Sequence, residues 1–151
     1  MTLRGPIYVY RRSEVTRVID GDTIQVKHSI DVGHRSEHVL GVTYRLAGIN
    51  TPELVGSTKE AGLTAKVYLE HLIDEANRLG PMPGEGLVIQ SAHLDKYGRR
   101  LAVLVPFNDY VRDRAILNGD LWIDNYFDEL SWNVSLNAKL VRAGHAVEYW
   151  P

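Results

Sequence analysis

The chain has no cysteine among its 151 residues. It therefore has no thiol for a disulfide bond, a zinc–thiolate site or a cysteine nucleophile. No stretch approaches the roughly 20 apolar residues that cross a bilayer, and the apolar run at 7–10 is shorter than the ~7–15-residue core of a secretory signal. These absences predict a cytoplasmic protein that does not bind membranes, although a secreted protein whose signal has been removed would share them.

An excess of positive charge is also missing. The chain has 17 lysines and arginines against 19 aspartates and glutamates, and its formal net charge is −2. Residues 1–50 carry seven basic and five acidic side chains, and residues 101–151 carry four and seven. This distribution excludes a protein that holds nucleic acid by bulk positive charge, so any phosphate contact is expected from a few placed arginines.

The remaining composition is that of an ordinary soluble domain. Hydrophobic residues make up 44% of the chain and charged residues 24%, which is enough apolar material for a core. No phosphate-binding glycine loop, dinucleotide-binding motif, serine elbow or zinc-protease helix motif is present. The length predicts one domain over residues 1–151, with a monomer as the default state.

Alternating apolar and polar residues predict strands in the first half. Strands at 14–19 and 23–27 flank an Asp-Gly pair, which is typical of a hairpin turn. A third strand is expected at 37–46, with a bulge or sharp bend at Gly41.

The rest of the pattern alternates between helix and strand. Ser57 to Glu60 fits a capping box at the start of a helix over 57–79, and further strands are expected at 87–90 and 100–105. A short helix at 109–117 and a last helix at 133–143 complete the order. We therefore predict an α+β fold, mainly β: a five-stranded OB-type barrel with helices packed on it, plus an insertion over 106–132.

Three charged clusters have plain structural interpretations when each is taken alone. Asp20 to Thr23 fits a hairpin turn, Arg45 and Glu53 fit a surface ion pair, and 95–100 fits a charged hairpin tip. His34 and His38 lie four apart in a loop region, where solvated histidines are more common than metal ligands.

Taken together, four segments resemble the motifs of the staphylococcal-nuclease (thermonuclease-like) family, in that family's own order. They are 19–23 (IDGDT), 44–53 (YRLAGINTPE), 95–99 (DKYGR) and 137–146 (NAKLVRAGHA). The resemblance covers about 14–105 and 133–150, and it implies the barrel fold and a metal-dependent nuclease acting on DNA or RNA.

The resemblance also implies roles for individual residues. Asp22, Asn50 and the backbone oxygen of Thr51 would hold a divalent cation, Ca²⁺ in most members, with Mn²⁺ or Mg²⁺ as alternatives. Glu53 would activate the attacking water, while Arg45 and Arg99 would bracket the scissile phosphate and leave a 3′-phosphate product. Lys96 and Tyr97 would contact the bound nucleotide.

These residue types suit that chemistry. Two guanidinium groups and a cation offset the negative charge of a phosphodiester, and calcium takes oxygen ligands. Asn50 is a departure, because many members have aspartate there, and we expect weaker or less selective metal binding.

The segment 106–132 departs from the family too. Its six acidic residues and two arginines would repel nucleic acid or shape a groove, and we expect a packing role for four aromatic residues: Trp122, Tyr126, Phe127 and Trp132.

Two other functions remain open at this point. A catalytically inactive barrel that binds nucleic acid or a protein partner would retain the fold without the chemistry. A structural module of a phage or mobile element would keep the motifs by descent alone.

Overall fold

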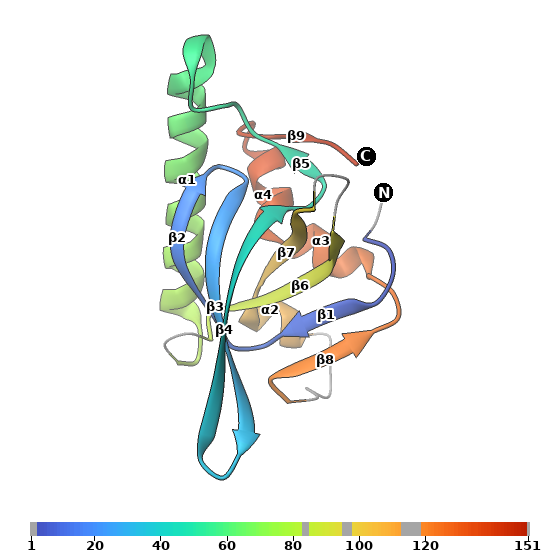
Figure 1. Cartoon of the computed structure of the whole chain (residues 1–151). Helices are drawn as coiled ribbons and strands as arrows, with labels where there is room; N and C mark the ends of the chain where they lie inside the picture. The colour runs from blue at the N-terminus through green and yellow to red at the C-terminus, as the bar shows by residue number, and fades with distance from the viewer. Residues whose placement is uncertain (1–2, 83–84, 95–97, 113–118, 151) are drawn as a thin grey trace.

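The computed structural model describes residues 3–82, 85–94, 98–112 and 119–150 as a mixed α+β structure made mainly of strands (Figure 1). The strands are β1 (Ile7–Tyr10), β2 (Ser13–Asp20), β3 (Thr23–Gly33), β4 (Ser36–Leu46), β5 (Ile49–Asn50), β6 (Leu87–Leu94), β7 (Arg100–Pro106), β8 (Leu121–Asp124) and β9 (Val147–Glu148). The helices are the 3₁₀ turn η1 (Gly56–Thr58), α1 (Lys59–Leu79), α2 (Phe107–Arg112), α3 (Glu129–Val134) and α4 (Leu136–Arg142). This confirms the predicted α+β class, mainly β.

Seven strands form one sheet in the order β2-β3-β4-β7-β6-β1-β8, and β5 pairs with β9 in a second, small sheet. The β4–β7 pair is parallel, and the other pairs are antiparallel. Within the described residues the larger sheet has two ends and is not closed into a barrel. β1 and β8 were not predicted from the sequence because each has only four residues, too few to show a clear alternation.

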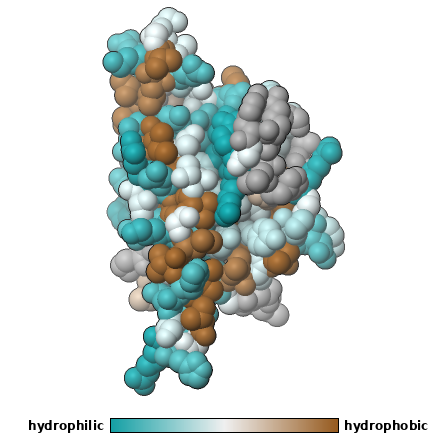
Figure 2. Space-filling model, in the orientation of Figure 1, coloured by the Kyte–Doolittle hydropathy of each residue, from teal (hydrophilic) through white to brown (hydrophobic). Residues whose placement is uncertain are grey.

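The predicted hairpin around Asp20 and Gly21 is confirmed by antiparallel pairing that brings Asp20 opposite Thr23. A second hairpin joins β3 to β4, and its tip projects below the rest of the molecule (Figure 1). His34 and Arg35 form its turn with positive φ angles of 54° and 61°. This tip is hydrophilic in Figure 2, and both His34 and His38 are exposed, as predicted.

Gly41 does not form the predicted bulge. The β3–β4 pairing runs through it without a register shift, and Gly41 lies directly opposite Lys27. The shifts lie elsewhere, between Val15 and Arg17, between Val18 and Asp20, and between Asp31 and Gly33.

The long helix α1 follows its predicted period but not its predicted cap. Ala65, Leu69, Leu72 and Ile73 are buried on one face, as 3.6-residue spacing requires. The capping box is wrong: Thr58 occupies the cap position without a side-chain cap bond, and its hydroxyl instead donates to the carbonyl oxygens of Glu53 and Val55.

The insertion contains α2, β8 and most of α3, and three of the four aromatic residues predicted to pack do so. Trp122, Phe127 and Trp132 lie against buried apolar residues, whereas the prediction for Tyr126 is wrong because its side chain is 83% exposed. The helix expected at 109–117 is α2, which ends at Arg112; residues 113–118 lie outside the described part.

The last predicted helix, 133–143, is interrupted. Ser135 ends α3 and caps α4 by accepting a hydrogen bond from the Ala138 amide. Gly144, with φ of +80°, follows the end of α4 as predicted.

Two apolar clusters lie on opposite faces of β6 and β7. This arrangement follows because successive side chains of a strand point to opposite faces of the sheet. Ile89 and Leu104 join the cluster under α1 and α4. Val88 and Val103 join the cluster under α2 and α3. In the part of the chain described here, no helix is long and apolar enough to cross a membrane.

Candidate functional site

The β2–β3 turn places Asp22 against the segment that follows β5. A Cβ atom on Gly21 would lie 2.9 Å from Ala65 Cβ and 2.9 Å from Thr51 Oγ1, so only glycine lets the turn pack this closely. Asp22 is buried there, and its carbonyl oxygen accepts a hydrogen bond of 2.8 Å from the Leu46 amide.

One carboxylate oxygen of Asp22 has two donors. Asp22 Oδ2 accepts a 3.0 Å hydrogen bond from the Thr51 amide and lies 3.2 Å from Arg45 Nη2. The Arg45 and Asp22 side chains are only 11% and 12% exposed, so this ion pair is shielded from water. The Asp22 Oδ1 atom lies 3.4 Å from the Thr23 hydroxyl.

Arg45 joins Asp22 to Asn50. Its Nη2 also donates to Asn50 Oδ1, and its Nη1 donates to the Leu46 carbonyl oxygen at 3.0 Å. The guanidinium is therefore held in one orientation at the end of β4. Four residues predicted from the sequence, Asp22, Arg45, Asn50 and Thr51, thus lie in one contiguous cluster.

The short β5–β9 sheet holds the position of Asn50. Asn50 lies opposite Val147 and Ile49 opposite Glu148, and the Tyr149 amide donates to the Gly48 carbonyl oxygen at 2.7 Å. Residues close to the end of the chain therefore support the strand that carries a predicted metal ligand.

Asp20 is part of this cluster, although the sequence analysis gave it no role. Its Oδ1 accepts a 3.0 Å hydrogen bond from the Asp22 amide. Burial and the neighbouring Asp20 side chain raise the pKa of Asp22, although Arg45 and the Thr51 amide act in the opposite direction. The signal for Asp20 was its place at the end of β2, two residues before Asp22 in the same motif.

A pocket of about 370 Å³ lies beside the cluster, between the β3–β4 face and residues 98–100. Its lining includes Thr23, Arg45, Arg99 and Arg100, so the two predicted arginines face one cavity. Arg99 is exposed, unlike Arg45. Arg100 is a further pocket residue that the sequence analysis missed, although it directly follows the predicted Arg99.

Three other predicted residues are not placed in the cluster. Glu53 is exposed, and within the described part of the chain its carboxylate makes no hydrogen bond or ion pair. Lys96 and Tyr97 lie outside the described residues.

The cluster offers oxygen donors of the kind that a hard cation takes, but Arg45 Nη2 contacts Asp22 Oδ2 and Asn50 Oδ1 and would have to turn away for a cation to bind both. No three His, Cys, Asp or Glu side chains lie close enough to hold a metal among the described residues. A cation here would therefore need the Asn50 amide oxygen and the Thr51 carbonyl oxygen in addition to Asp22. Oxygen donors of this kind suit Ca²⁺, and the repulsion between Asp20 and Asp22 is what a cation would relieve.

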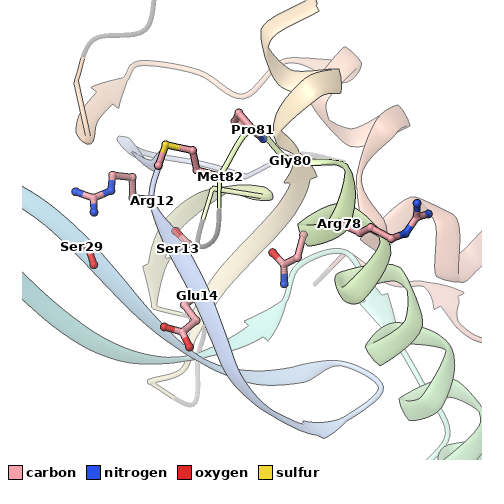
Figure 3. Close-up of a pocket in the computed structure, with 9 residues that line it drawn as sticks. Arg12, Ser13, Glu14, Ser29, Arg78, Gly80, Pro81 and Met82 are labelled. Carbon is pink, nitrogen blue, oxygen red and sulfur yellow. The ribbon is translucent and has the colours of Figure 1, made fainter.

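A larger pocket, of about 760 Å³, lies near the end of α1 and contains none of the predicted residues (Figure 3). Its two arginines, Arg12 and Arg78, point in different directions (Figure 3). Arg12 pairs with Glu37 at 2.6 Å, Asp120 at 3.5 Å and Glu85 at 3.8 Å, so its charge is already compensated.

Comparison with protein-family models and with curated proteins finds no match to this chain.

Proposed function

We propose that this protein is a divalent-metal-dependent nuclease that hydrolyses phosphodiester bonds in DNA and, by the same chemistry, in RNA. The observation that supports this most is the buried cluster in which Arg45 joins Asp22 to Asn50, beside a pocket that Arg99 and Arg100 also line. Oxygen donors and guanidinium groups next to one cavity are what an anionic substrate and a cation require.

The arginines would stabilise the charge that develops on the phosphate. Arg45 Nη1 is held by the Leu46 carbonyl, while Nη2 would release Asp22 and Asn50 when a cation binds them and would then donate to the phosphate. Arg99 and Arg100 approach the pocket from the β7 side. A planar guanidinium can bind two phosphate oxygens at once, which suits this role better than a lysine.

Asp22, Asn50 and the Thr51 carbonyl would hold the cation, with Asp20 as a neighbouring carboxylate. When bound, a hard cation supplies positive charge that stabilises the transition state. Calcium fits this donor set, and Mn²⁺ or Mg²⁺ are alternatives. Asn50 lacks the charge of an aspartate, so we expect weaker binding than a site with two carboxylate ligands would give.

Glu53 would act as the general base. Its carboxylate would accept a proton from a water molecule while the water oxygen bonds to phosphorus and the P–O5′ bond breaks. The products would be a 3′-phosphate and a 5′-hydroxyl, whose oxygen takes its proton from solvent water. Glu53 lies two residues after half-buried Thr51, on the segment between β5 and η1. Its side chain would turn toward the pocket when substrate occupies it.

We also propose that the curved sheet is an OB-type barrel with added strands. Only Arg11 and Arg12 separate β1 from β2, yet these two strands lie toward opposite ends of the sheet order. Residues 7–20 would thus act as one bent strand that joins the two ends. The contacts between β2 and β6 support this arrangement.

The second candidate is a catalytically inactive module that binds nucleic acid. The observation in its favour is that the Glu53 carboxylate contacts none of the other described site residues. Loss of the base would leave a groove that binds a substrate without cleaving it.

The test is cleavage of a labelled DNA oligonucleotide with Ca²⁺, Mn²⁺, Mg²⁺ or chelator. We expect cleavage by the unaltered chain and a loss of about 100-fold or more in Arg45→Ala and Glu53→Gln. Glu70→Gln is the matched control, because Glu70 is exposed on α1, away from the cluster. Binding without cleavage by the unaltered chain would support the inactive module instead.

A further inference from the structure

The pocket beside Arg45 extends along β4 to Gly41. Its lining includes Gly41 and Thr43, both exposed, in addition to the three arginines. Gly41 lies in regular β-structure opposite Lys27 and forms no bulge. A Cβ atom built on Gly41 would meet no other atom within 4 Å, so neither a close contact nor a special backbone angle requires glycine here.

The missing side chain therefore shapes the surface. Residues 39, 41 and 43 point to the same side of β4 because side chains alternate along a strand. Val39 and Thr43 are exposed on either side of Gly41, and Lys27 is exposed on the neighbouring strand. Gly41 leaves a depression among these side chains. A glycine inside a strand often marks a site that a ligand or another backbone approaches closely.

The charge of the depression favours an anion. Of the described residues that line the pocket, three are arginines and none is an aspartate or glutamate, and the charge of one of the three, Arg45, is compensated by Asp22. Lys27, which has Glu14 opposite it on β2, adds a positive charge beside Gly41 at the far end, and the hydroxyls of Thr23 and Thr43 offer polar contacts. The chain as a whole is slightly acidic, so this concentration of positive charge is local.

We propose that the groove from Arg45 to Gly41 binds the nucleotide next to the scissile phosphate in a single-stranded nucleic acid. The unstacked base lies in the depression over Gly41, and the adjoining phosphate lies toward Lys27. This proposal rests on the proposed function, because it places the scissile phosphate at Arg45.

The size of the groove supports a single strand. A volume of about 370 Å³ is at the lower end for small-molecule pockets and suits a unit as small as one nucleotide. A base fills such a depression only when it leaves its stack, which is easy in a single strand and costly in a duplex.

The test uses Gly41→Val, which fills the depression with a residue that favours strands. Affinity for a labelled single-stranded DNA oligonucleotide is measured by fluorescence anisotropy with Ca²⁺ present, in the Glu53→Gln background to prevent cleavage. We expect about tenfold weaker binding, since contacts with one base contribute roughly 1–3 kcal/mol. Thermal unfolding checks that Gly41→Val is as stable as its parent.

Ser36→Val is the matched control. Ser36 is exposed on the same strand, about 16 Å from Gly41 at ~3.3 Å per residue, and outside the pocket. We expect its affinity to equal that of the parent. Equal affinity of Gly41→Val and the parent would overturn the proposal, and so would a parent that binds duplex as tightly as single strand or binds neither.

A separate measurement distinguishes this proposal from the proposed function. Cleavage of the same oligonucleotide is assayed with the unaltered chain. Absence of cleavage together with weaker binding by Gly41→Val would reject the nuclease while supporting the binding groove. Cleavage together with unchanged binding by Gly41→Val would reject the groove alone.

Discussion

His28 is a fully buried titratable residue in the main core. Its Nδ1 shares a 2.8 Å hydrogen bond with Ser13 Oγ, and its Nε2 shares one of 2.6 Å with the Tyr44 hydroxyl. The Tyr10 ring stacks on it with a centroid distance of 3.7 Å. Burial, with a smaller effect from Arg100, lowers the pKa of His28 to about 4.

This predicts a loss of stability in mild acid. The unfolded chain takes up the proton near the ordinary histidine pKa of about 6.5, while the folded chain resists it until about pH 4. The free energy of unfolding should therefore fall by about 3 kcal/mol between pH 6.5 and 4 from this residue alone. Urea titrations of the unaltered chain and His28→Gln at pH 7, 5.5 and 4 measure it. The same pH dependence in both proteins would contradict the prediction.

The sequence predicted part of the candidate site at the level of residues. Asp22, Arg45, Asn50 and Thr51 stand in two short motifs, and the structure brings the four together. Asp20 and Arg100 were missed because an aspartate at the end of a strand and an arginine at the start of one are ordinary on their own. The structure shows that Asp20 Oδ1 accepts a hydrogen bond from the Asp22 amide and that Arg100 is one of the residues lining the pocket. Their roles stay predictions.

Among the elements, the small β5–β9 sheet depends on a contact between Gly48 and Trp150. Gly48 has a φ of +75°, and a Cβ atom there would lie 2.3 Å from a carbon of the Trp150 ring. Trp150 also packs on Trp132, with ring centroids 5.0 Å apart. The insertion and the residues after α4 thus meet beside the strand that carries Asn50.

We predict that Gly48→Ala lowers the free energy of unfolding by more than the cost of placing alanine at a positive φ angle. Gly144→Ala is the matched control, because Gly144 has a similar φ of +80° and open space around it. The control should cost about 1–2 kcal/mol in unfolding free energy, and Gly48→Ala at least twice as much. In a Trp150→Ala background the difference should disappear. Equal costs in all backgrounds would show that Trp150 does not constrain Gly48.

The elements differed in how well the sequence predicted them. α1 was predictable because six turns repeat one apolar period, whereas its cap was not, because Thr58 bonds to carbonyl groups of the preceding turn. β8 lies in an acidic, aromatic segment and is defined by its pairing with β1. Such pairing depends on residues more than 100 positions away, which no local pattern contains.

At the scale of the whole molecule, Asn137 connects the last helix to the sheet. It is fully buried, and its side chain bonds three backbone groups: its Oδ1 accepts from the Leu104 amide, and its Nδ2 donates to the carbonyl oxygens of Ala47 and Ala102. These groups belong to β7 and to the segment between β4 and β5. One amide therefore joins distant parts of the chain near the site.

We predict that Asn137→Ala lowers the free energy of unfolding by about 3 kcal/mol or more, because it leaves buried backbone groups without partners. Asn133→Ala is the matched control, since Asn133 is exposed at the end of α3. Urea unfolding of both variants measures the difference. A change below about 1 kcal/mol in Asn137→Ala would mean that water replaces the lost bonds.

The overall class was predictable, and the strand order was not. Alternating residues predicted a mainly β protein with packed helices, but nothing local indicates that β1 pairs with both β6 and β8. That pairing adds β1 and β8 to one end of the sheet. In the described residues the sheet has two ends and does not close into a barrel.

The most direct test of the central claim is cleavage of a single-stranded DNA oligonucleotide by the unaltered chain, with Ca²⁺ and then with chelator. We predict cleavage with Ca²⁺, none with chelator, and recovery when Ca²⁺ is restored. A folded protein that cleaves nothing with any divalent cation, or that cleaves equally well in chelator, would contradict a metal-dependent nuclease built on Asp22, Arg45 and Asn50.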